Sequence, residues 1–361
     1  MQLSLLKSRR EVLDLSPAVA DLARRVVSRY DLTNLPEYFL ARMASSSRPS
    51  VVACHEAGKL VGVMYVKERR LYGIPTGWCF GGDETGRGLV TAKPEQESEV
   101  ITRSCQFLLD HGMHALRLRW RCIDRAALAP GIVGSGLQVV SRTEEQPEGD
   151  LLELPDGYET FLSGIGPHTR RNLRYYRRKA EAEGIRFIRR IDVEEYERAV
   201  KAMREVTDFP HDPIRQERDR RFFRVLGEPL LMGLKGNGGK FVSILAAVRF
   251  EKCLHVLSQL NDQSLRRMSI SVVLRSYLIE EAIKLGFTSI HFVNGSSPML
   301  GRYCQALPVQ TILIDQRHSL LHPIKAGGAR LLRTHQIGTR WLPVRFRKIL
   351  GSYSAEPNGA H

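Results

Sequence analysis

Residues 239–307 read GKFVSILAAVRFEKCLHVLSQLNDQSLRRMSISVVLRSYLIEEAIKLGFTSIHFVNGSSPMLGRYCQAL. The parts at 241–250 and 253–260 are apolar and rich in β-branched residues, and Glu251-Lys252 between them suits a tight turn. Two such runs separated by two residues predict a β-hairpin.

A helix and a third strand follow this hairpin. Apolar residues recur at helical spacing over 270–285, and Gly286 suits the left-handed conformation at a helix C-terminus. Residues 288–293 then alternate as a strand, which Asn294-Gly295 ends. The predicted order is strand, strand, polar loop, helix and strand, and then a short helix that carries Tyr303.

This order resembles the core of the GNAT acyltransferase superfamily. In that family the loop before the helix holds the CoA pyrophosphate on backbone N–H groups at the helix N-terminus, where the helix dipole favours an anion. The family pattern Q/R-x-x-G-x-G/A corresponds to residues 266–271, with Arg266 in place and Ser269 and Ser271 at the two small positions. Serine departs from the pattern, although it permits a fairly close backbone approach and is a good N-cap.

The resemblance implies acetyl-CoA or another acyl-CoA as co-substrate, without a metal. The strand edge 258–260 would hold the pantetheine, and the loop would hold the pyrophosphate. The implied donor-binding residues are Ser258, Gln259, Leu260, Arg266, Arg267, Ser269, Ser271 and Asn294.

The composition is that of a globular protein with an unusual charge. The length of 361 residues suits two domains of about 150 residues each. No apolar run approaches the roughly 20 residues of a membrane span. The six cysteines are scattered without a CxxC pair, which argues for reduced thiols in the cytoplasm and against zinc or a disulfide framework. The net charge of +15 favours a polyanionic partner such as CoA, tRNA or an anionic membrane surface; a high baseline charge of the whole proteome is the alternative.

The first part of the chain repeats the element order of 239–307. Gly58-Lys59 stands between two strand-like segments as Gly239-Lys240 does, and a helix over about 95–111 precedes a strand at 115–120. We interpret this as two degenerate copies of one unit; chance matching of short segments is the alternative. The predicted domains are 1–150, a degenerate N-terminal copy, and 151–316, with a basic tail over 317–361.

Between the copies, residues 167–183 predict an Arg-rich helix. Its arginines interleave with Tyr175 and Tyr176, a combination that suits phosphate contact and stacking. We predict substrate contacts for Arg171 and Arg174; an ordinary solvated helix face is the alternative.

Such a helix between two acyltransferase-like halves resembles the CelD/BcsL-type proteins of bacterial cellulose biosynthesis and, more distantly, the FemAB aminoacyl-tRNA-dependent transferases. A Gly-Gly-Asp segment at 81–83 is also found in CelD-type chains. The resemblance implies an α/β (α+β) fold of tandem GNAT-like domains, each a mixed or antiparallel sheet flanked by helices.

Acyl transfer from a thioester needs an acid near the sulfur and groups that orient the acceptor. The GNAT resemblance implies Tyr303 as that acid, and packing of its ring is the alternative. Asp83 is the second catalytic candidate, although an Asp after two glycines is often a turn residue. Trp78 and His211 are predicted on the acceptor side, where the HDP sequence at 211–213 also suits a plain turn.

These observations predict an N-acyltransferase that moves an acyl group from acyl-CoA to an amine or hydroxyl between the two halves. One alternative is a Fem-like transferase that takes its acyl group from aminoacyl-tRNA. Another is an inactive GNAT-like module in polysaccharide biosynthesis. We expect a cytoplasmic protein, with docking on the inner membrane through the basic tail as a further alternative to packing of that tail.

Overall fold

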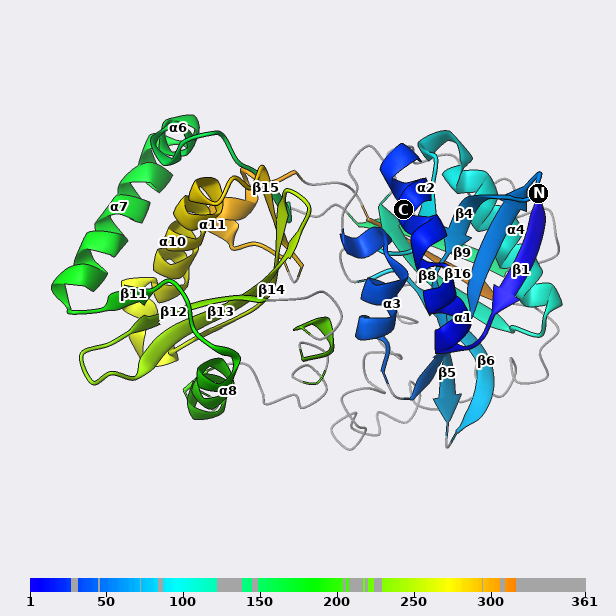
Figure 1. The fold of residues 1–361 in the computed structure, drawn as a ribbon, viewed down its shortest axis with the longest axis horizontal. Coiled ribbons are helices and arrows are strands. Elements are labelled where there is room, and N and C mark those ends of the chain that lie inside the picture. The colour runs from blue at the N-terminus through cyan, green and yellow to red at the C-terminus, as the bar shows by residue number, and fades with distance from the viewer. Residues whose placement is uncertain are drawn as a thin grey trace, which may run out of the picture.

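The computed structural model describes residues 1–26, 32–44, 46–71, 73–83, 87–121, 138–144, 149–203, 206–207, 217, 220–223, 229–293, 295–305 and 309–315. It shows a mixed α/β protein whose two halves lie side by side (Figure 1). Within the described ranges, no helix combines the length and apolar character that crossing a bilayer requires.

The first half contains a four-stranded sheet in the order β1-β3-β4-β7 and most of a six-stranded sheet in the order β2-β5-β6-β8-β16-β9. Its elements are β1 (Gln2–Leu6), α1 (Arg9–Asp14), α2 (Ser16–Val26), η1 (Leu32–Asn34), α3 (Pro36–Arg42), β2 (Ser47–Pro49), β3 (Val51–Glu56), β4 (Lys59–Met64), β5 (Val66–Leu71), β6 (Ile74–Gly81), β7 (Val90–Ala92), η2 (Pro94–Gln96), α4 (Glu97–Asp110), β8 (Ala115–Arg121) and β9 (Gln138–Glu144).

The second half is built on a six-stranded sheet in the order β10-β15-β14-β13-β12-β11. Its elements are β10 (Leu151–Glu153), α6 (Tyr158–Gly164), α7 (Pro167–Ala182), β11 (Arg186–Ile188), α8 (Val193–Ala202), β12 (Pro229–Lys235), β13 (Phe241–Phe250), β14 (Cys253–Asn261), η4 (Gln263–Met268), α10 (Ile270–Lys284), β15 (Ser289–Phe292) and α11 (Pro298–Gly301), and β16 (Val309–Asp315) follows them in the chain.

The two halves share one order of elements, as the repeat predicts. Gly58 and Gly239 adopt positive φ angles of 76° and 70° in the turns before β4 and β13, which pair antiparallel with β3 and β12. In each half a helix then connects two parallel strands, namely α4 between β6 and β8 and α10 between β14 and β15.

Each half receives a strand from the other side of the boundary. β16 follows the second half in the chain, yet it pairs with β8 and β9 in the sheet of the first half. The predicted division placed residues 309–315 in the second domain, and the strand pairing differs from it here. The physical reason is burial: Ile312 and Ile314 lie in the apolar core of the first half. β10 in turn pairs with β15 at the edge of the second sheet.

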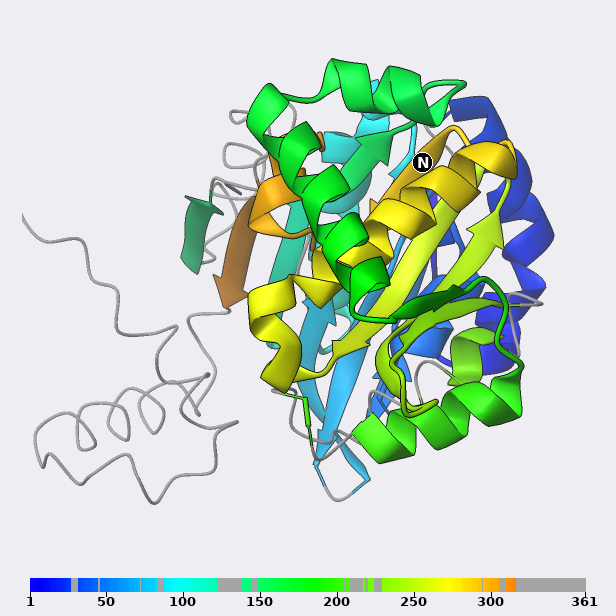
Figure 2. The same cartoon turned by 90° about the vertical axis from the view of Figure 1, so that its left-hand side faces the viewer.

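Alternate residues of β13 divide the surroundings of the second sheet. Leu245 and Ala247 face α7 and α10, which lie over the outer face of the sheet (Figure 2). Ile244 and Ala246 face α8 on the opposite face. Val248 lies on that same face and packs against residues of the first half, including Leu35 and Tyr38 of the η1–α3 segment. The inner face is therefore covered partly by α8 and partly by the first half.

Arg177 links α7 to α10. Its Nη1 donates to Glu280 Oε2 at 2.7 Å, and the guanidinium carbon lies 3.9 Å from the centre of the Tyr277 ring. Tyr277 also stacks on Phe187 of β11, with ring centres 4.4 Å apart. Half of this Arg-rich helix thus serves packing rather than solvent contact, which fixes α7 beside the helix that follows the η4 loop.

Candidate functional site

The strands β14 and β15 diverge, and this leaves an open strand edge. They pair in parallel only over Cys253–Val256, and the last bond between them runs from the Val293 N–H to the Val256 carbonyl at 3.1 Å. β14 continues to Asn261 in contact with β13, with a bulge near Leu257. Within the described residues, no strand pairs with the other edge of 257–261. A bulge beside a free edge is a common way to aim backbone groups at a ligand.

The loop after β14 leads into α10 through one residue in the left-handed conformation. Ser269 has φ 51° and ψ 42°, and its carbonyl accepts from the N–H groups of Val272 and Val273. The N–H groups of Ile270 and Ser271 precede the first intrahelical bond, so they are the free donors of this helix end. Ser269 therefore adopts the conformation that glycine adopts most easily.

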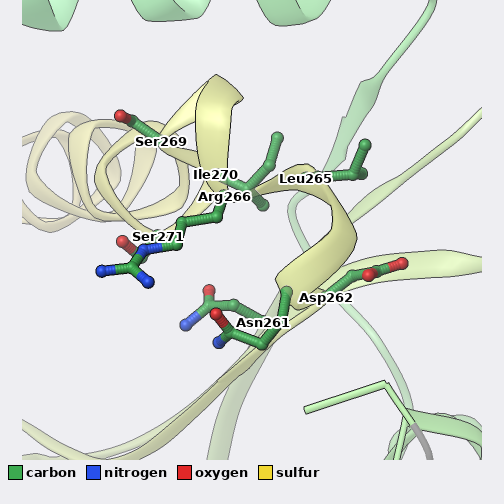
Figure 3. Close-up of a pocket in the computed structure, with 8 residues that line it drawn as sticks. Asn261, Asp262, Leu265, Arg266, Ser269, Ile270 and Ser271 are labelled. Atoms are coloured by element: carbon green, nitrogen blue, oxygen red, sulfur yellow. The ribbon is translucent and has the colours of Figure 1, made fainter. Parts of the chain in front are cut away.

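A pocket of about 310 Å³ lies between the end of β14, η4 and the start of α10. It is lined by Asn261, Asp262, Gln263, Leu265, Arg266, Ser269, Ile270 and Ser271. The side chains of Arg266 and Ser271 point to one side of the loop, whereas the hydroxyl of Ser269 points away from them (Figure 3). In the described part of the chain Arg266 makes no ion pair. The Asp262 carboxylate instead accepts from the N–H and hydroxyl of Ser264, at 2.9 and 2.6 Å.

Gln259 fixes this pocket to the strand. Its Nε2 donates to the Ser271 carbonyl at 3.1 Å and to Asn261 Oδ1 at 3.0 Å. Its Oε1 accepts from Arg275 Nε at 2.8 Å, and the Arg275 guanidinium lies over the ring of Phe292. Gln259 was predicted to contact the donor, and here its side chain positions the first turn of α10.

The neighbours of Gln259 on β14 turn their side chains toward α8. The Ser258 hydroxyl is buried and lies 3.1 Å from the hydroxyl of Tyr196 on α8. Leu260 packs against the same apolar cluster. Both residues therefore offer backbone groups, rather than side chains, to the open edge.

Arg267 and Asn294 complete the predicted donor set. Arg267 is exposed next to Arg266 and does not line the pocket. Asn294 lies outside the described residues.

Tyr303 contacts the start of α7. Its hydroxyl accepts from the Gly166 N–H at 2.9 Å and donates to the Thr169 hydroxyl at 3.1 Å. Both of these groups belong to the N-terminal turn of α7, so Tyr303 stabilises that helix end. The neighbouring Cys304 is buried, and its Sγ lies 3.4 Å from the Leu300 carbonyl.

Asp83 lies in the first half within a buried polar cluster. It accepts from the Tyr38 hydroxyl at 3.0 Å and from the Arg87 N–H at 2.9 Å, and Arg42 lies 3.6 Å away. Burial raises the pKa of Tyr38, so its hydroxyl stays protonated and keeps donating. Asp83 thus combines the predicted turn role with contacts to two helical side chains of the η1–α3 segment.

The predicted acceptor residues do not gather at one place. Trp78 begins the parallel pairing of β6 with β8, roughly 15 Å along the strand from Asp83. Arg171 and Arg174 are exposed on α7, where Arg174 pairs with Glu159 at 2.7 Å. His211 lies outside the described residues.

The equivalent helix start in the first half is unsuited to a phosphate. α4 begins with Glu97, whose pKa burial raises to about 7, and it carries Glu99 in the same turn. Carboxylates at a helix N-terminus occupy the position that favours an anion. The helix start that exposes N–H groups beside an arginine is therefore α10.

Comparisons with known proteins agree with this geometry. Residues 167–299 match a family model described as an acetyltransferase (GNAT) domain. The second half thus carries a GNAT-fold acyltransferase-like domain. No curated protein sequence matches the chain.

Solved structures with similar folds include tandem GNAT proteins. FemX is 10% identical, with a TM-score of 0.56, over 82% of this chain and 89% of FemX. A tandem GNAT protein from the clavulanic acid biosynthesis pathway is 9% identical, with a TM-score of 0.51, over 88% and 100%. The C-terminal domain of a putative lysylphosphatidylglycerol synthetase from Agrobacterium fabrum is 12% identical, with a TM-score of 0.51, over 91% and 96%. At these identities the likeness shows the fold alone.

Sequence reasoning missed part of the pocket and its supports. Asn261, Asp262 and Gln263 line the pocket, and the Asp-x-Ser spacing of Asp262 and Ser264 is a turn signal that could have placed the loop. Among the described residues, no group of three or more His, Cys, Asp or Glu side chains is arranged to hold a metal ion.

Proposed function

We propose that this chain is an acyltransferase that takes its acyl group from acetyl-CoA or a longer acyl-CoA and passes it to an amine or hydroxyl. The observation that carries the proposal is the pocket at the end of β14, where an open strand edge meets the exposed N–H groups of Ile270 and Ser271 beside Arg266. Oriented N–H groups and a guanidinium are the groups that bind a pyrophosphate.

The open edge of β14 supplies the second requirement. Pantetheine contains two amides, which can hydrogen-bond to an unpaired strand edge as an added strand would. The thioester supplies an activated carbonyl carbon. Backbone N–H groups of the edge 257–261 would polarise its oxygen while the acceptor forms the new C–N or C–O bond and the C–S bond breaks.

In this proposal the acceptor's proton passes to a base, and the thiolate takes up a proton from an acid. Tyr303 and Asp83 remain the predicted catalytic residues. The contacts of Tyr303 with Gly166 and Thr169 favour a positioning role for it. Asp83 lies on the first-half side, where Trp78, Arg171, Arg174 and His211 remain the predicted acceptor contacts.

The test is calorimetric titration of the full chain with acetyl-CoA and, separately, with a long-chain acyl-CoA. We expect micromolar binding, weakened at least about tenfold by Arg266→Ala, the loss typical of one charge-assisted contact to phosphate. Arg103→Ala is the control, because Arg103 is an exposed arginine that pairs only weakly within α4 of the first half. Equal weakening by both variants would indicate a general charge effect, and absence of binding by the unsubstituted chain would sink the proposal.

One observation favours a second candidate, transfer from aminoacyl-tRNA. Arg171, Arg174 and Arg178 are exposed along one face of α7, together with Tyr175, which is 49% exposed. Such a stripe suits the phosphates and bases of RNA. Filter binding of charged and uncharged tRNA to the chain and to an Arg171→Ala/Arg178→Ala variant tests this candidate; salt-dependent binding that the variant loses would support it.

The narrower resemblance to CelD/BcsL-type proteins, a cytoplasmic location and docking on an anionic membrane belong to this proposal as well. Each is separable from the donor question, because the donor titration requires none of them.

A further inference from the structure

Four buried side chains form one continuous chain of contacts across the two halves. Arg87 Nε of the first half lies 3.3 Å from Asp150 Oδ2, and the same oxygen lies 3.3 Å from His291 Nε2 on β15. His291 Nδ1 then lies 3.1 Å from His255 Nδ1 on β14. Both histidines are 0% exposed and Asp150 is 1% exposed. Ionisable groups this deeply buried are costly unless they are paired.

The contacts fix how many protons the two imidazoles hold. His291 Nε2 donates to the Asp150 carboxylate, which is an acceptor when ionised. The contact between the two Nδ1 atoms holds one proton, so His255 Nδ1–H donates to His291 Nδ1 when both rings are neutral. If both rings are protonated, two N–H groups face each other at 3.1 Å. The pair is therefore compatible with at most one added proton.

The pair lies at the point where the donor edge begins. His255 and His291 are register partners in the parallel pairing, and the next pair, Val256 with Phe292, is the last before the strands diverge. The β14 edge that the proposed function gives to the thioester starts directly after it. At the other end of the chain, Arg87 donates its backbone N–H to Asp83, which binds Tyr38.

From this geometry we infer that the Asp150–His291–His255 chain is a positioning device that couples the protonation of the two histidines and the seating of the first half to the divergence of β14 and β15. This inference rests on the proposed function, because it gives the divergence the role of the donor edge. The neutral pair holds the two strands together up to Val256, and protonation of both rings separates them one residue pair earlier.

The charged and titratable groups around the pair are named as follows. Asp150, from the segment before β10, and Arg87, from the loop after β6, face it directly; Asp83, Arg42 and Tyr38 lie behind them. On the pair's own strands, Cys253 precedes His255 by two residues, and the turn before β14 carries Glu251, which pairs with Arg24 of α2. β13 contributes the ring of Phe250, 6.2 Å from His255. A single carboxylate thus faces the two imidazoles directly in the contacts described here.

The sign of the pH dependence follows from the proton count. Histidine is the side chain that changes charge between about pH 5 and 8. On acidification the unfolded chain protonates both imidazoles, and the folded pair resists the second proton. Stability therefore falls as the pH decreases, because the unfolded state binds more protons.

The experiment compares wild type, His291→Gln and His291→Ala at pH 7.5 and 5.5, by thermal unfolding and by titration with acetyl-CoA. Glutamine reproduces the neutral arrangement, because its amide N–H can donate to Asp150 and its oxygen can accept from His255, and it does not titrate. We expect wild type to lose about tenfold in affinity at pH 5.5 relative to His291→Gln, the ratio that corresponds to one unit of proton linkage. His291→Ala should bind weakly at both pH values, and His291→Gln should restore most of the binding.

The two readouts separate this inference from the proposed function. Melting profiles of wild type and His291→Gln that run parallel from pH 7.5 to 5.5 overturn the inference, whether or not acetyl-CoA binds. Profiles that diverge while acetyl-CoA binds wild type equally well at both pH values also overturn it, because the pair then does not position the donor edge. Diverging profiles with no binding at any pH overturn the proposed function, and with it the link to the donor edge.

Discussion

Gly149 lies so close to Cys304 that a Cβ atom on Gly149 would be 2.4 Å from the carbonyl oxygen of Cys304. The Gly149 N–H donates to the Gly301 carbonyl at 3.1 Å, and its own carbonyl accepts from the Ser296 hydroxyl at 2.6 Å. The chain therefore enters β10 through a channel of backbone atoms that come from the end of the second half. This is the junction at which a strand before the second half joins its sheet.

Gly149→Ala should destabilise the chain by about 2–4 kcal/mol, because backbone carbonyls cannot move aside as a flexible side chain can. The measurement is the change in thermal or urea unfolding. Gly164→Ala is the matched control, since nothing lies within 4 Å of a Cβ at that glycine in α6, and alanine favours the helix. Similar effects of both substitutions would contradict the close packing at Gly149.

Two arginines three residues apart on α7 should differ sharply in their contribution to stability. Arg177 is half-buried, pairs with Glu280 and lies over Tyr277, whereas Arg174 is 52% exposed and pairs with the exposed Glu159. We expect Arg177→Met to cost about 2 kcal/mol and Arg174→Met less than about 0.5 kcal/mol, because desolvated ion pairs and cation–π contacts count more than exposed ones.

Urea unfolding of the two variants checks this prediction. Equal losses would show that the position of Arg177 between α7 and α10 carries no special stability. A loss of tRNA or acyl-CoA binding by Arg174→Met without a loss of stability would instead assign that residue to the surface function of α7.

Local patterns in the sequence predicted the elements around the candidate site well. The hairpin expected at 241–250 and 253–260 is β13 and β14, which ends at Asn261, and the helix expected at 270–285 is α10. These elements are encoded by runs of neighbouring residues: apolar β-branched strands, a two-residue turn and helical periodicity. The repeat was visible because Gly58 and Gly239 occupy equivalent turns that need a positive φ.

Contacts between distant segments were not predictable in the same way. β16 pairs with β8, nearly 200 residues earlier in the chain, and nothing in the sequence of 309–315 indicates which sheet it joins. His255 and His291 are separated by 36 residues, and only the parallel register of β14 and β15 makes them neighbours. The hydroxyl of Tyr303 likewise acquires its role from Gly166, across 137 residues. Patterns of short range carry the elements, and the register between them carries the site.

Ser269→Gly should stabilise the chain by about 1 kcal/mol. Ser269 is a non-glycine residue with φ 51°, and the left-handed conformation costs roughly 1–2 kcal/mol for residues that have a Cβ. Glycine removes that cost and keeps the turn that presents Ile270 and Ser271. Differential scanning calorimetry should therefore show a higher unfolding temperature, with acetyl-CoA binding retained.

Ser271→Gly is the matched control for this prediction. Ser271 is the second residue of α10, where glycine costs roughly 0.5–1 kcal/mol in helix stability. The two serines of the loop should thus respond in opposite directions to the same substitution. A loss of stability in Ser269→Gly would mean that the serine side chain contributes more than the strain it introduces.

Glu97 should make the first half less stable as the pH rises. Burial raises the pKa of its carboxyl from the ordinary value of 4.5 to about 7, so the folded chain keeps this proton at pH values where the unfolded chain has lost it. The stabilising contribution is complete below about pH 4.5, decreases through the window from 4.5 to 7, and is lost above it. Glu97→Gln replaces the protonated acid by a neutral group of the same shape. The variant should match wild type near pH 4.5 and exceed it at pH 8 by on the order of 1 kcal/mol. Unfolding by urea at both pH values provides the measurement, and Glu99→Gln, an exposed carboxylate one turn position away, should show no such growth with pH. If the two variants changed in parallel, the effect would come from the net charge of the α4 N-terminus rather than from the burial of Glu97.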